Sequence, residues 1–257
     1  MKRTAGYVWK PDTEVDMAHK YFLTSLDGDT ATVAGREAKH LVKVMRLREG
    51  DSVILTDKTG YDYDAVAQTV TDGEILFKVS GKRKNAAEPK SELTVFMALP
   101  KRDKLEFITQ KMCELGAKEI VPFVSEYCVA QKSKRDESKT ARLQKISDEA
   151  TKQCGRSAPM TVRQTKTFKE ILPMLARFDK VILLYEHGAE PFSKIDFSFC
   201  KKAALIVGSE GGFSQREADR LVRQGAVNTV LGARILRCET ARVAGATLLM
   251  YALGEFE

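Results

Sequence analysis

The sequence predicts an α/β protein in two parts, a small β-barrel followed by a larger domain with a mostly parallel sheet. Short strand-like runs separated by turns fill the region from Met17 to about residue 80. After residue 92, continuous apolar runs alternate with helical patterns, which is typical of a sheet that helices cover on both faces. A polar, basic stretch at 81–91 separates the two patterns. We therefore expect an extension over 1–16, the barrel over 17–82, a linker over 83–91 and the α/β domain over 92–257.

Composition excludes several classes of protein. Of the 257 residues, 43% are hydrophobic and 30% are charged, an ordinary globular mix that rules out disorder along the whole chain. No apolar run approaches the roughly 20 residues that cross a bilayer, and the N-terminus lacks the apolar segment of a secretory signal. We therefore expect a cytoplasmic protein with no membrane partner. Lys and Arg number 42 against 35 Asp and Glu, and the net charge of +7 favours a polyanionic partner.

The spacing of cysteine and histidine indicates neither disulfide bonds nor a metal site. None of the cysteines forms a C-x-x-C pair, and the histidines lie far apart. We expect free thiols in a reducing compartment and no bound metal. The residues concerned are Cys113, Cys128, Cys154, Cys200, Cys238, His19, His40 and His187.

The first part of the chain is expected to hold short strands and one helix. Strands are expected at 17–23, 52–56, 63–67 and 74–79, with turns at 58–60 and 71–73. A helix is expected over 36–46, because Ala38, Leu41, Val44 and Met45 recur on one face. This mixture suggests a small barrel.

The second part alternates buried strands with helices. Apolar runs predict strands at 93–99, 120–124, 181–185, 204–207 and 228–231. Apolar residues at helical spacing predict helices at 105–115, 138–154, 168–177, 215–224 and 237–253, the last of them rich in alanine. Gly116 is a plausible stop for the first of these helices.

Two glycine-rich turns carry the strongest sign of a ligand site. The segment GSEGGFS at 208–214 follows a buried strand and precedes a helix, which Ser214 and Glu217 are expected to begin with a capping box. The segment LGARILRCETA at 231–241 repeats the order of strand, glycine turn and helix. Glycines leave backbone N–H groups open to a ligand, and ligands of open α/β sheets bind beyond the carboxyl ends of strands. Neither turn has the spacing of a dinucleotide or P-loop motif, so a tight turn without a ligand stays open on these residues alone.

Charged residues border the last predicted helix. Arg234, Arg237 and Glu239 lie next to a segment that is expected to be buried, so they need partners in the protein or in a ligand. The small residues that follow, over 243–249, suit close packing, including packing against a second copy of the chain.

Taken together, these segments resemble the 16S ribosomal RNA (uracil-1498-N3)-methyltransferases, a family of the SPOUT superfamily of knotted methyltransferases. Besides the two glycine turns, LPKRDKLE at 99–106, QKMCELG at 110–116, KQCGR at 152–156 and HLVKVMRLREGD at 40–51 match elements of that family. The resemblance extends from Met17 to the C-terminus, and because members usually begin near Met17, we expect 1–16 to be an extension or a mis-assigned start. Ser209 and Ala233 stand where proline is frequent, and Lys152 stands where an acid is common.

The resemblance implies a fold, a cofactor and an assembly. It implies a trefoil knot in the C-terminal SPOUT domain, a PUA-like fold for the N-terminal β-barrel, and S-adenosylmethionine bound among three loops. It also implies a homodimer in which a second subunit completes the site. Carried onto this sequence, the cofactor-binding residues are Leu184, Tyr185, Glu186, Gly208, Ser209, Glu210, Gly211, Gly212, Leu231, Gly232, Ile235, Leu236, Arg237 and Thr240.

The implied reaction is methylation of uracil N3 in 16S ribosomal RNA within the assembled small subunit. The N3–H group is only weakly acidic, so the site needs a base or groups that stabilise the uracil anion, and the uracil must leave its stack. Glu210 and Glu239 are candidate bases, and the candidate stabilising cations are Arg234, Arg237 and Arg156. The RNA-binding residues are expected to be Lys20, His40, Lys43, Arg46, Arg48, Arg102 and Arg156.

Two other functions stay open on the sequence. A related knotted enzyme that methylates a ribose 2′-hydroxyl also has a Gly-x-Glu turn, although LGARILRCETA favours the uracil enzyme. A ribosome-assembly factor could bind RNA and transfer nothing, and it would then fail to bind S-adenosylmethionine. The intact turn at 208–212 argues against this second alternative.

Overall fold

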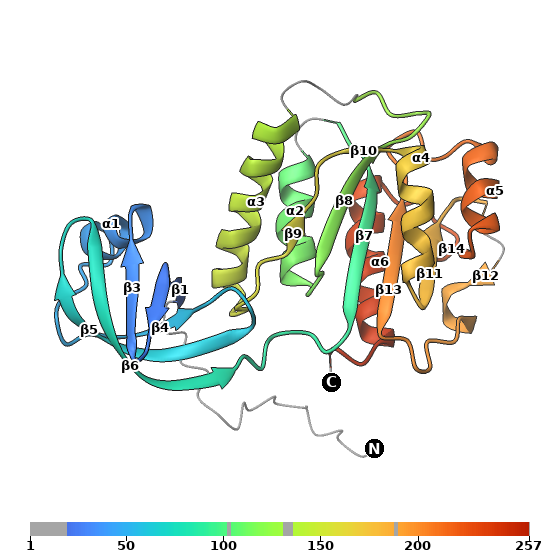
Figure 1. Cartoon of the computed structure of the whole chain (residues 1–257). Coiled ribbons are helices and arrows are strands. Elements are labelled where there is room, and N and C mark those ends of the chain that lie inside the picture. The colour runs from blue at the N-terminus through green and yellow to red at the C-terminus, as the bar shows by residue number, and fades with distance from the viewer. Residues whose placement is uncertain (1–19, 102–103, 131–135, 188–189, 257) are drawn as a thin grey trace, which may run out of the picture. The chain divides into compact units, whose positions relative to one another are not determined.

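The computed structural model describes residues 20–101, 104–130, 136–187 and 190–256 (Figure 1). The described chain divides into two units, each with its own core. The first holds the described residues up to Leu55 together with Tyr63–Lys82, and the second holds Thr56–Asp62 and the described residues from Arg83 onward. The expected extension at 1–16, the start of the strand expected at 17–23, and Arg102 lie outside the described residues.

The first unit is built on a six-stranded sheet whose order is β1-β4-β5-β6-β3-β2. Because β1 and β2 form the two edges of this sheet, the β-barrel that we expected takes the form of a half-barrel sheet. The strands expected at 52–56, 63–67 and 74–79 are confirmed as β4, β5 and β6. The strands are β1 (Lys20–Phe22), β2 (Ser25–Asp27), β3 (Thr30–Ala34), β4 (Ser52–Thr56), β5 (Tyr61–Val70) and β6 (Glu74–Lys84).

One helix, α1 (Arg36–Lys43), packs on this sheet. Its buried residues Ala38 and Leu41 join the core that Ile75 and Phe77 of β6 help to form. The helix ends before the expected position 46, because Arg46 has a φ of 56°, in the left-handed region that an α-helix cannot contain.

The stretch expected to be a linker is part strand and part buried connection. Strand β6 continues to Lys84, and Asn85, which follows it, is only 5% exposed. The Asn85 Nδ2 group donates to Asp62 Oδ2 at 2.9 Å and to the Gly155 carbonyl at 2.8 Å. These bonds attach the connection firmly to the second unit, so it does not behave as a solvated linker.

The second unit contains an eight-stranded sheet in which all the described strand pairs are parallel. Its order is β10-β8-β7-β13-β11-β14-β12, with β9 paired to β8. The five strands expected from apolar runs are confirmed as β7, β8, β11, β13 and β14. The strands are β7 (Glu92–Ala98), β8 (Glu119–Val124), β9 (Thr161–Val162), β10 (Lys166–Thr167), β11 (Lys180–Leu184), β12 (Glu190–Pro191), β13 (Lys202–Val207) and β14 (Ala226–Val230).

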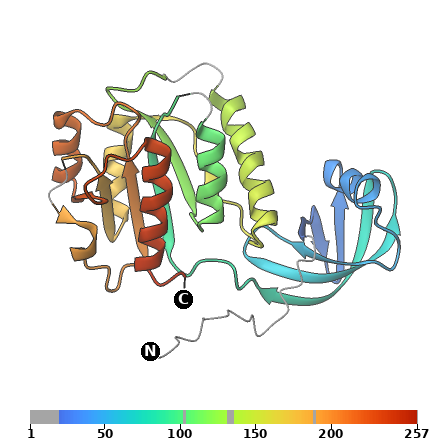
Figure 2. The ribbon, with the colours of Figure 1, turned by 180° about the vertical axis from the view of Figure 1, so that it is seen from behind.

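Helices cover both faces of the parallel sheet (Figures 1 and 2). Val95 and Met97 of β7 pack on the face that α2, α3 and α6 cover, whereas Phe96 and Ala98 pack on the face that α4, η1 and α5 cover. Pro173 splits the helix expected at 168–177 into α4 and a 3₁₀ segment, because proline cannot donate the next helical hydrogen bond. The helices are α2 (Lys104–Glu114), α3 (Asp136–Gln153), α4 (Phe168–Ile171), η1 (Leu172–Arg177), η2 (Phe192–Lys194), α5 (Gln215–Arg223) and α6 (Cys238–Ala252). Among the described helices, none is long and apolar enough to cross a membrane.

Candidate functional site

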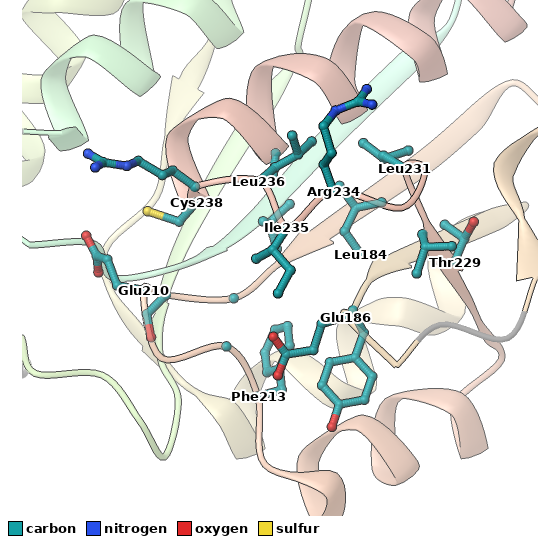
Figure 3. A pocket seen from close by; sticks show the side chains of 18 of the residues that line it. Leu184, Glu186, Glu210, Phe213, Thr229, Leu231, Arg234, Ile235, Leu236 and Cys238 are labelled. Carbon is teal, nitrogen blue, oxygen red and sulfur yellow. The ribbon is translucent and has the colours of Figure 1, made fainter.

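A pocket of about 480 Å³ opens where β11, β13 and β14 end (Figure 3). Because β11 lies between the other two strands in a parallel sheet, the three carboxyl ends meet at one edge, where α/β proteins bind ligands. Lys104 at the start of α2 and Cys238 at the start of α6 also line the pocket.

The pocket brings together most of the residues that were predicted to bind the cofactor. Those that line it are Leu184, Tyr185, Glu186, Gly208, Ser209, Glu210, Gly212, Leu231, Gly232, Ile235, Leu236 and Arg237. Arg234 lines it as well. Gly211 and Thr240 are not among the lining residues, although both are adjacent in sequence to residues that line the pocket.

The first glycine turn, Gly208–Phe213, is closed tightly on itself. The Gly212 N–H donates to the Ser209 carbonyl at 3.0 Å, and Gly212 has a φ of 68° that favours glycine. A Cβ on Gly208 would lie 3.0 Å from the Gly212 carbonyl carbon, and one on Gly211 would lie 2.8 Å from Tyr127 Cβ. Glycine is therefore required at these positions by close approach of the chain to itself.

The capping box predicted at the start of α5 is confirmed. The Ser214 hydroxyl accepts from the Glu217 N–H at 3.3 Å, and the Glu217 carboxylate accepts from the Ser214 N–H at 3.2 Å. Beside it, Phe213 stacks on Phe123 with ring centroids 6.3 Å apart. The cap and the stacked rings fix the direction in which the chain leaves the pocket.

The sequence prediction missed Lys104, the cation that contacts both candidate bases. Its Nζ lies 2.8 Å from Glu239 Oε2 and 3.3 Å from Glu210 Oε1. Glu210 also accepts a hydrogen bond of 3.1 Å from the backbone N–H of Lys101. The two carboxylates therefore share one ammonium group at the end of the pocket where Figure 3 shows Glu210 and Cys238.

The electrostatics of this cluster keep both carboxyl groups ionised. The hydrogen bond from Lys104 lowers the pKa of Glu239 to about 2, and the same bond raises the pKa of Lys104. Burial alone would raise the pKa of Glu210, but backbone N–H donors and Lys104 outweigh it and lower that pKa. A carboxylate whose pKa is lowered is a weaker proton acceptor, which disfavours either glutamate as a general base.

We predict that this ion pair can be observed directly by titration. In carbon-detected NMR of the wild-type chain, the Glu239 carboxyl should stay ionised until the pH falls to about 2. In the Lys104→Met variant its pKa should rise toward the ordinary value of about 4.3, because the hydrogen bond that lowers it is gone. An unchanged titration curve in the variant would contradict the assigned contact.

Arg242 is a second charged residue that the sequence prediction missed. It is fully buried in α6, and its Nη2 donates to the Ala98 carbonyl at 2.7 Å and to the Gly208 carbonyl at 2.8 Å. It thereby joins the ends of β7 and β13 beneath the first glycine turn. Burial lowers the pKa of this guanidinium below its usual value.

The second glycine turn, from Leu231 to Arg237, is more exposed than the first. Gly232 has a φ of 81°, and Ile235 leaves 87% of its surface exposed although it lines the pocket. Arg234 is also exposed, and Figure 3 shows its guanidinium directed away from the middle of the pocket. This turn thus presents the apolar side chain of Ile235 and the exposed cation of Arg234 at the pocket mouth.

The residues predicted to bind RNA fall in different settings. His40, Lys43, Arg46 and Arg48 are exposed in the first unit, and Lys43 forms a salt bridge of 3.2 Å with Asp72. Lys20 is partly buried in β1, and Arg102 lies outside the described residues.

Arg156 is a correction to the sequence prediction. We expected it to contact RNA or the reacting base, but it is only 5% exposed. Its Nη2 lies 3.1 Å from Glu88 Oε2, and its Nη1 donates to the carbonyls of Cys113 (2.9 Å) and Ala117 (3.0 Å). With its donors used inside the protein, Arg156 supports the fold rather than the substrate.

A sequence signal existed for both missed cations. Lys104 begins a helix, where the helix dipole disfavours positive charge, so its position implies nearby carboxylates. Arg242 directly precedes the small residues of α6, in a segment expected to be buried, where an unpaired charge would be costly.

Comparisons with known proteins agree with this architecture. A family model described as an RNA methyltransferase domain matches residues 87–250, and one described as an RNA methyltransferase PUA domain matches residues 33–80. The ribosomal RNA small subunit methyltransferase E of Bacillus subtilis (strain 168) is 33% identical over 233 residues, which cover 88% of this chain and 91% of that protein. Its namesake from Aquifex aeolicus (strain VF5) is 28% identical over 235 residues, which cover 90% of this chain and 99% of that protein.

A solved structure shares the fold. The ribosomal RNA small subunit methyltransferase E from Neisseria gonorrhoeae, crystallised with S-adenosyl methionine, superposes with a TM-score of 0.84 at 24% sequence identity. The match covers 91% of this chain and 97% of that chain, so both units have counterparts in it.

Proposed function

Since the chain belongs to the family of ribosomal RNA small subunit methyltransferase E, we propose that it methylates N3 of uracil 1498 in 16S ribosomal RNA, with S-adenosylmethionine as the methyl donor. The observation that carries this proposal is the pocket at the ends of β11, β13 and β14, which both glycine turns line. The match covers 91% of the length of the Bacillus subtilis relative, so the proposal rests on nearly all of that relative and not on one part of it.

The pocket fits S-adenosylmethionine in size and chemistry. Its volume of about 480 Å³ suits a ligand of this size. Leu184, Leu231 and Leu236 offer apolar surface to an adenine ring, and the glycine turns offer backbone groups to its polar edge. The carboxylates of Glu186 and Glu210 would face a ligand that carries positive charge on sulfur and on its amino group. The cofactor-binding set listed in the sequence analysis, with Gly211 and Thr240 at its margin, is proposed on these grounds.

The chain itself must position a uracil and help its N3 proton to leave. Bound S-adenosylmethionine supplies a methyl group attached to a positively charged sulfur. We assign Arg234 and Arg237 to the RNA at the pocket mouth, because both are exposed cations that line the pocket. Glu210 and Glu239 are the carboxylates that hold Lys104 in place beside the substrate.

The domain organisation and the knot form part of the proposal. We assign residues 17–82 to RNA binding and 92–257 to methyl transfer, which follows the two compact units except that Thr56–Asp62 belongs to the second. Exposed His40, Lys43, Arg46 and Arg48 support contact with RNA phosphates. A trefoil knot formed by the segments that line the pocket is supported by the strand order, which inserts β13 between β7 and β11.

The assembly proposed for the chain is a homodimer. Leu248 and Tyr251 of α6 remain 39% and 63% exposed, and such apolar side chains on one helix suit contact with a second copy. Because the proposed substrate is the assembled small ribosomal subunit, we propose that the chain acts in the cytoplasm. Light scattering at several protein concentrations tests the dimer, and a monomer mass at all of them would contradict it.

Transfer of a labelled methyl group tests the substrate class. Tritium-labelled S-adenosylmethionine is incubated with the chain and one of three substrates: small ribosomal subunits that lack the methylation, large subunits, or transfer RNA. Label should enter only the RNA of the small subunit. Label in the large subunit or in transfer RNA, with the small subunit unlabelled, would overturn the proposed substrate.

A further inference from the structure

The reaction requires negative charge on the uracil ring, and the candidate bases are poorly suited to generate it. Glu210 and Glu239 are both bound to Lys104, at 3.3 and 2.8 Å, and their pKa values are lowered. The N3–H group of uracil is far less acidic than a carboxylic acid. Proton transfer from N3 to such a carboxylate is therefore strongly uphill, and stabilisation of the anion by a cation is the better route.

Lys104 is the cation best placed for this task. It lines the pocket, and its side chain is 29% exposed, so it is accessible to a ligand in the pocket. An ammonium group has three N–H donors. Two of them are directed to Glu239 and Glu210. Within the described part of the chain, the other polar contact of this group is Cys238 Sγ at 3.9 Å, which is long and weak. A substrate oxygen can replace that contact without breaking either ion pair.

The groups around Lys104 hold it charged and in place. From α6 it faces Glu239 and Cys238, and from the turn after β13 it faces Glu210. Arg242 lies behind this cluster, and its charge acts on Cys238 and Glu210. The two carboxylates balance the charges of Lys104 and the buried Arg242, so the ammonium group is oriented before a substrate arrives, as electrostatic catalysis requires.

We propose that Lys104 is a catalytic residue that donates a hydrogen bond to a carbonyl oxygen of the uracil and stabilises the uracil anion from which N3 attacks. The N3 proton passes to water. The N3 electron pair then forms the new bond to the methyl carbon as the bond from that carbon to sulfur breaks, and its electrons stay on sulfur. Glu210 and Glu239 are positioning residues for Lys104. This inference rests on the function proposed above.

The test compares the pH dependence of methyl transfer in Lys104→Met and wild-type protein, with unmethylated small subunits in single-turnover reactions. At neutral pH the variant should be slower by about 100-fold or more, the usual cost of one lost oxyanion donor. Its rate should keep rising at pH values where the wild-type rate has levelled, because its uracil anion forms only at higher pH. Subunits containing 5-fluorouracil, whose N3–H is more acidic, should reduce the defect.

Two readouts separate this role from a structural or a cofactor-binding role. Calorimetry should give the same Kd for S-adenosylmethionine in wild-type and Lys104→Met protein, and Lys104→Arg should restore part of the rate because it keeps the charge. Lys104→Gln serves as a second variant should Lys104→Met fold poorly. Lys111→Met is the matched control, since Lys111 lies on the same helix and pairs only with Glu114 among the salt bridges described.

Three results would overturn the proposal. If the pH profile of Lys104→Met runs parallel to that of the wild-type protein and the variant binds S-adenosylmethionine much more weakly, Lys104 serves in cofactor binding. A rate in Lys104→Met that holds or rises, with activity abolished in Glu239→Gln, would make Glu239 the general base, because loss of Lys104 makes that carboxylate more basic. Failure of the wild-type protein to methylate any uracil N3 would overturn the proposed function itself, and this inference with it.

Discussion

Replacement of Arg156 by methionine is expected to lower the free energy of unfolding by about 3 kcal/mol or more. The substitution leaves the Glu88 carboxylate, whose side chain is 12% exposed, without its cation. It also removes the donors to the carbonyls of Cys113 and Ala117. Removal of one partner from a buried ion pair is costly because the remaining charge stays desolvated. Urea denaturation followed by circular dichroism measures the loss.

A surface ion pair and a double variant provide the controls. Arg142 pairs with Glu106 at 2.7 Å, but their side chains are 71% and 45% exposed, so Arg142→Met should cost less than about 1 kcal/mol. In Arg156→Met with Glu88→Gln, the unpaired charge is removed and an amide oxygen still accepts from the Ser157 and Ala158 N–H groups. The double variant should therefore lose less stability than the sum of the two single variants. Equal losses for Arg156→Met and Arg142→Met would show that the buried pair does not stabilise the fold.

Replacement of Gly208 by alanine is expected to weaken S-adenosylmethionine binding by about 100-fold, or about 2.8 kcal/mol. The added Cβ would lie 3.0 Å from both the carbonyl carbon and the Cα of Gly212. These are backbone atoms of the turn that lines the pocket, and they can move only if the bond from Gly212 N–H to the Ser209 carbonyl is disturbed. Isothermal titration calorimetry measures the change in Kd.

Gly73→Ala is the matched control for this substitution. A Cβ at Gly73 meets nothing within 4 Å, and no positive φ restricts that position. Its Kd for S-adenosylmethionine should equal that of the wild-type chain. If Gly208→Ala bound the cofactor as tightly as Gly73→Ala does, the assignment of the cofactor to the first glycine turn would be wrong.

Local patterns in the sequence were enough to predict most of the second unit. Continuous apolar runs such as 93–99 mark strands that are covered on both faces, and the structure places β7 at Glu92–Ala98. The capping box at Ser214 was also readable, because all of its groups lie within four consecutive residues. Strands β9, β10 and β12 were missed, since two residues each are too short to show a period.

Contacts between distant parts of the chain could not be predicted in this way. The sequence places Glu210 and Glu239 near glycine turns, but it does not show that Lys104, from another helix, lies between them. Arg156 misled the sequence prediction for the same reason: its partner Glu88 belongs to a stretch that reads as a solvated linker. The order of the strands, which creates the pocket, is likewise a property of the whole fold.

Fragment mass spectrometry of small ribosomal subunits tests the central claim most directly. Subunits that lack their uracil methylation are incubated with the chain and S-adenosylmethionine, and their RNA is then cut into fragments. The account predicts a gain of one methylene unit on the fragment that contains uracil 1498, and digestion to nucleosides should then yield 3-methyluridine. No gain on that fragment, with S-adenosylmethionine still bound by the protein, would contradict the proposed target while leaving the cofactor site intact.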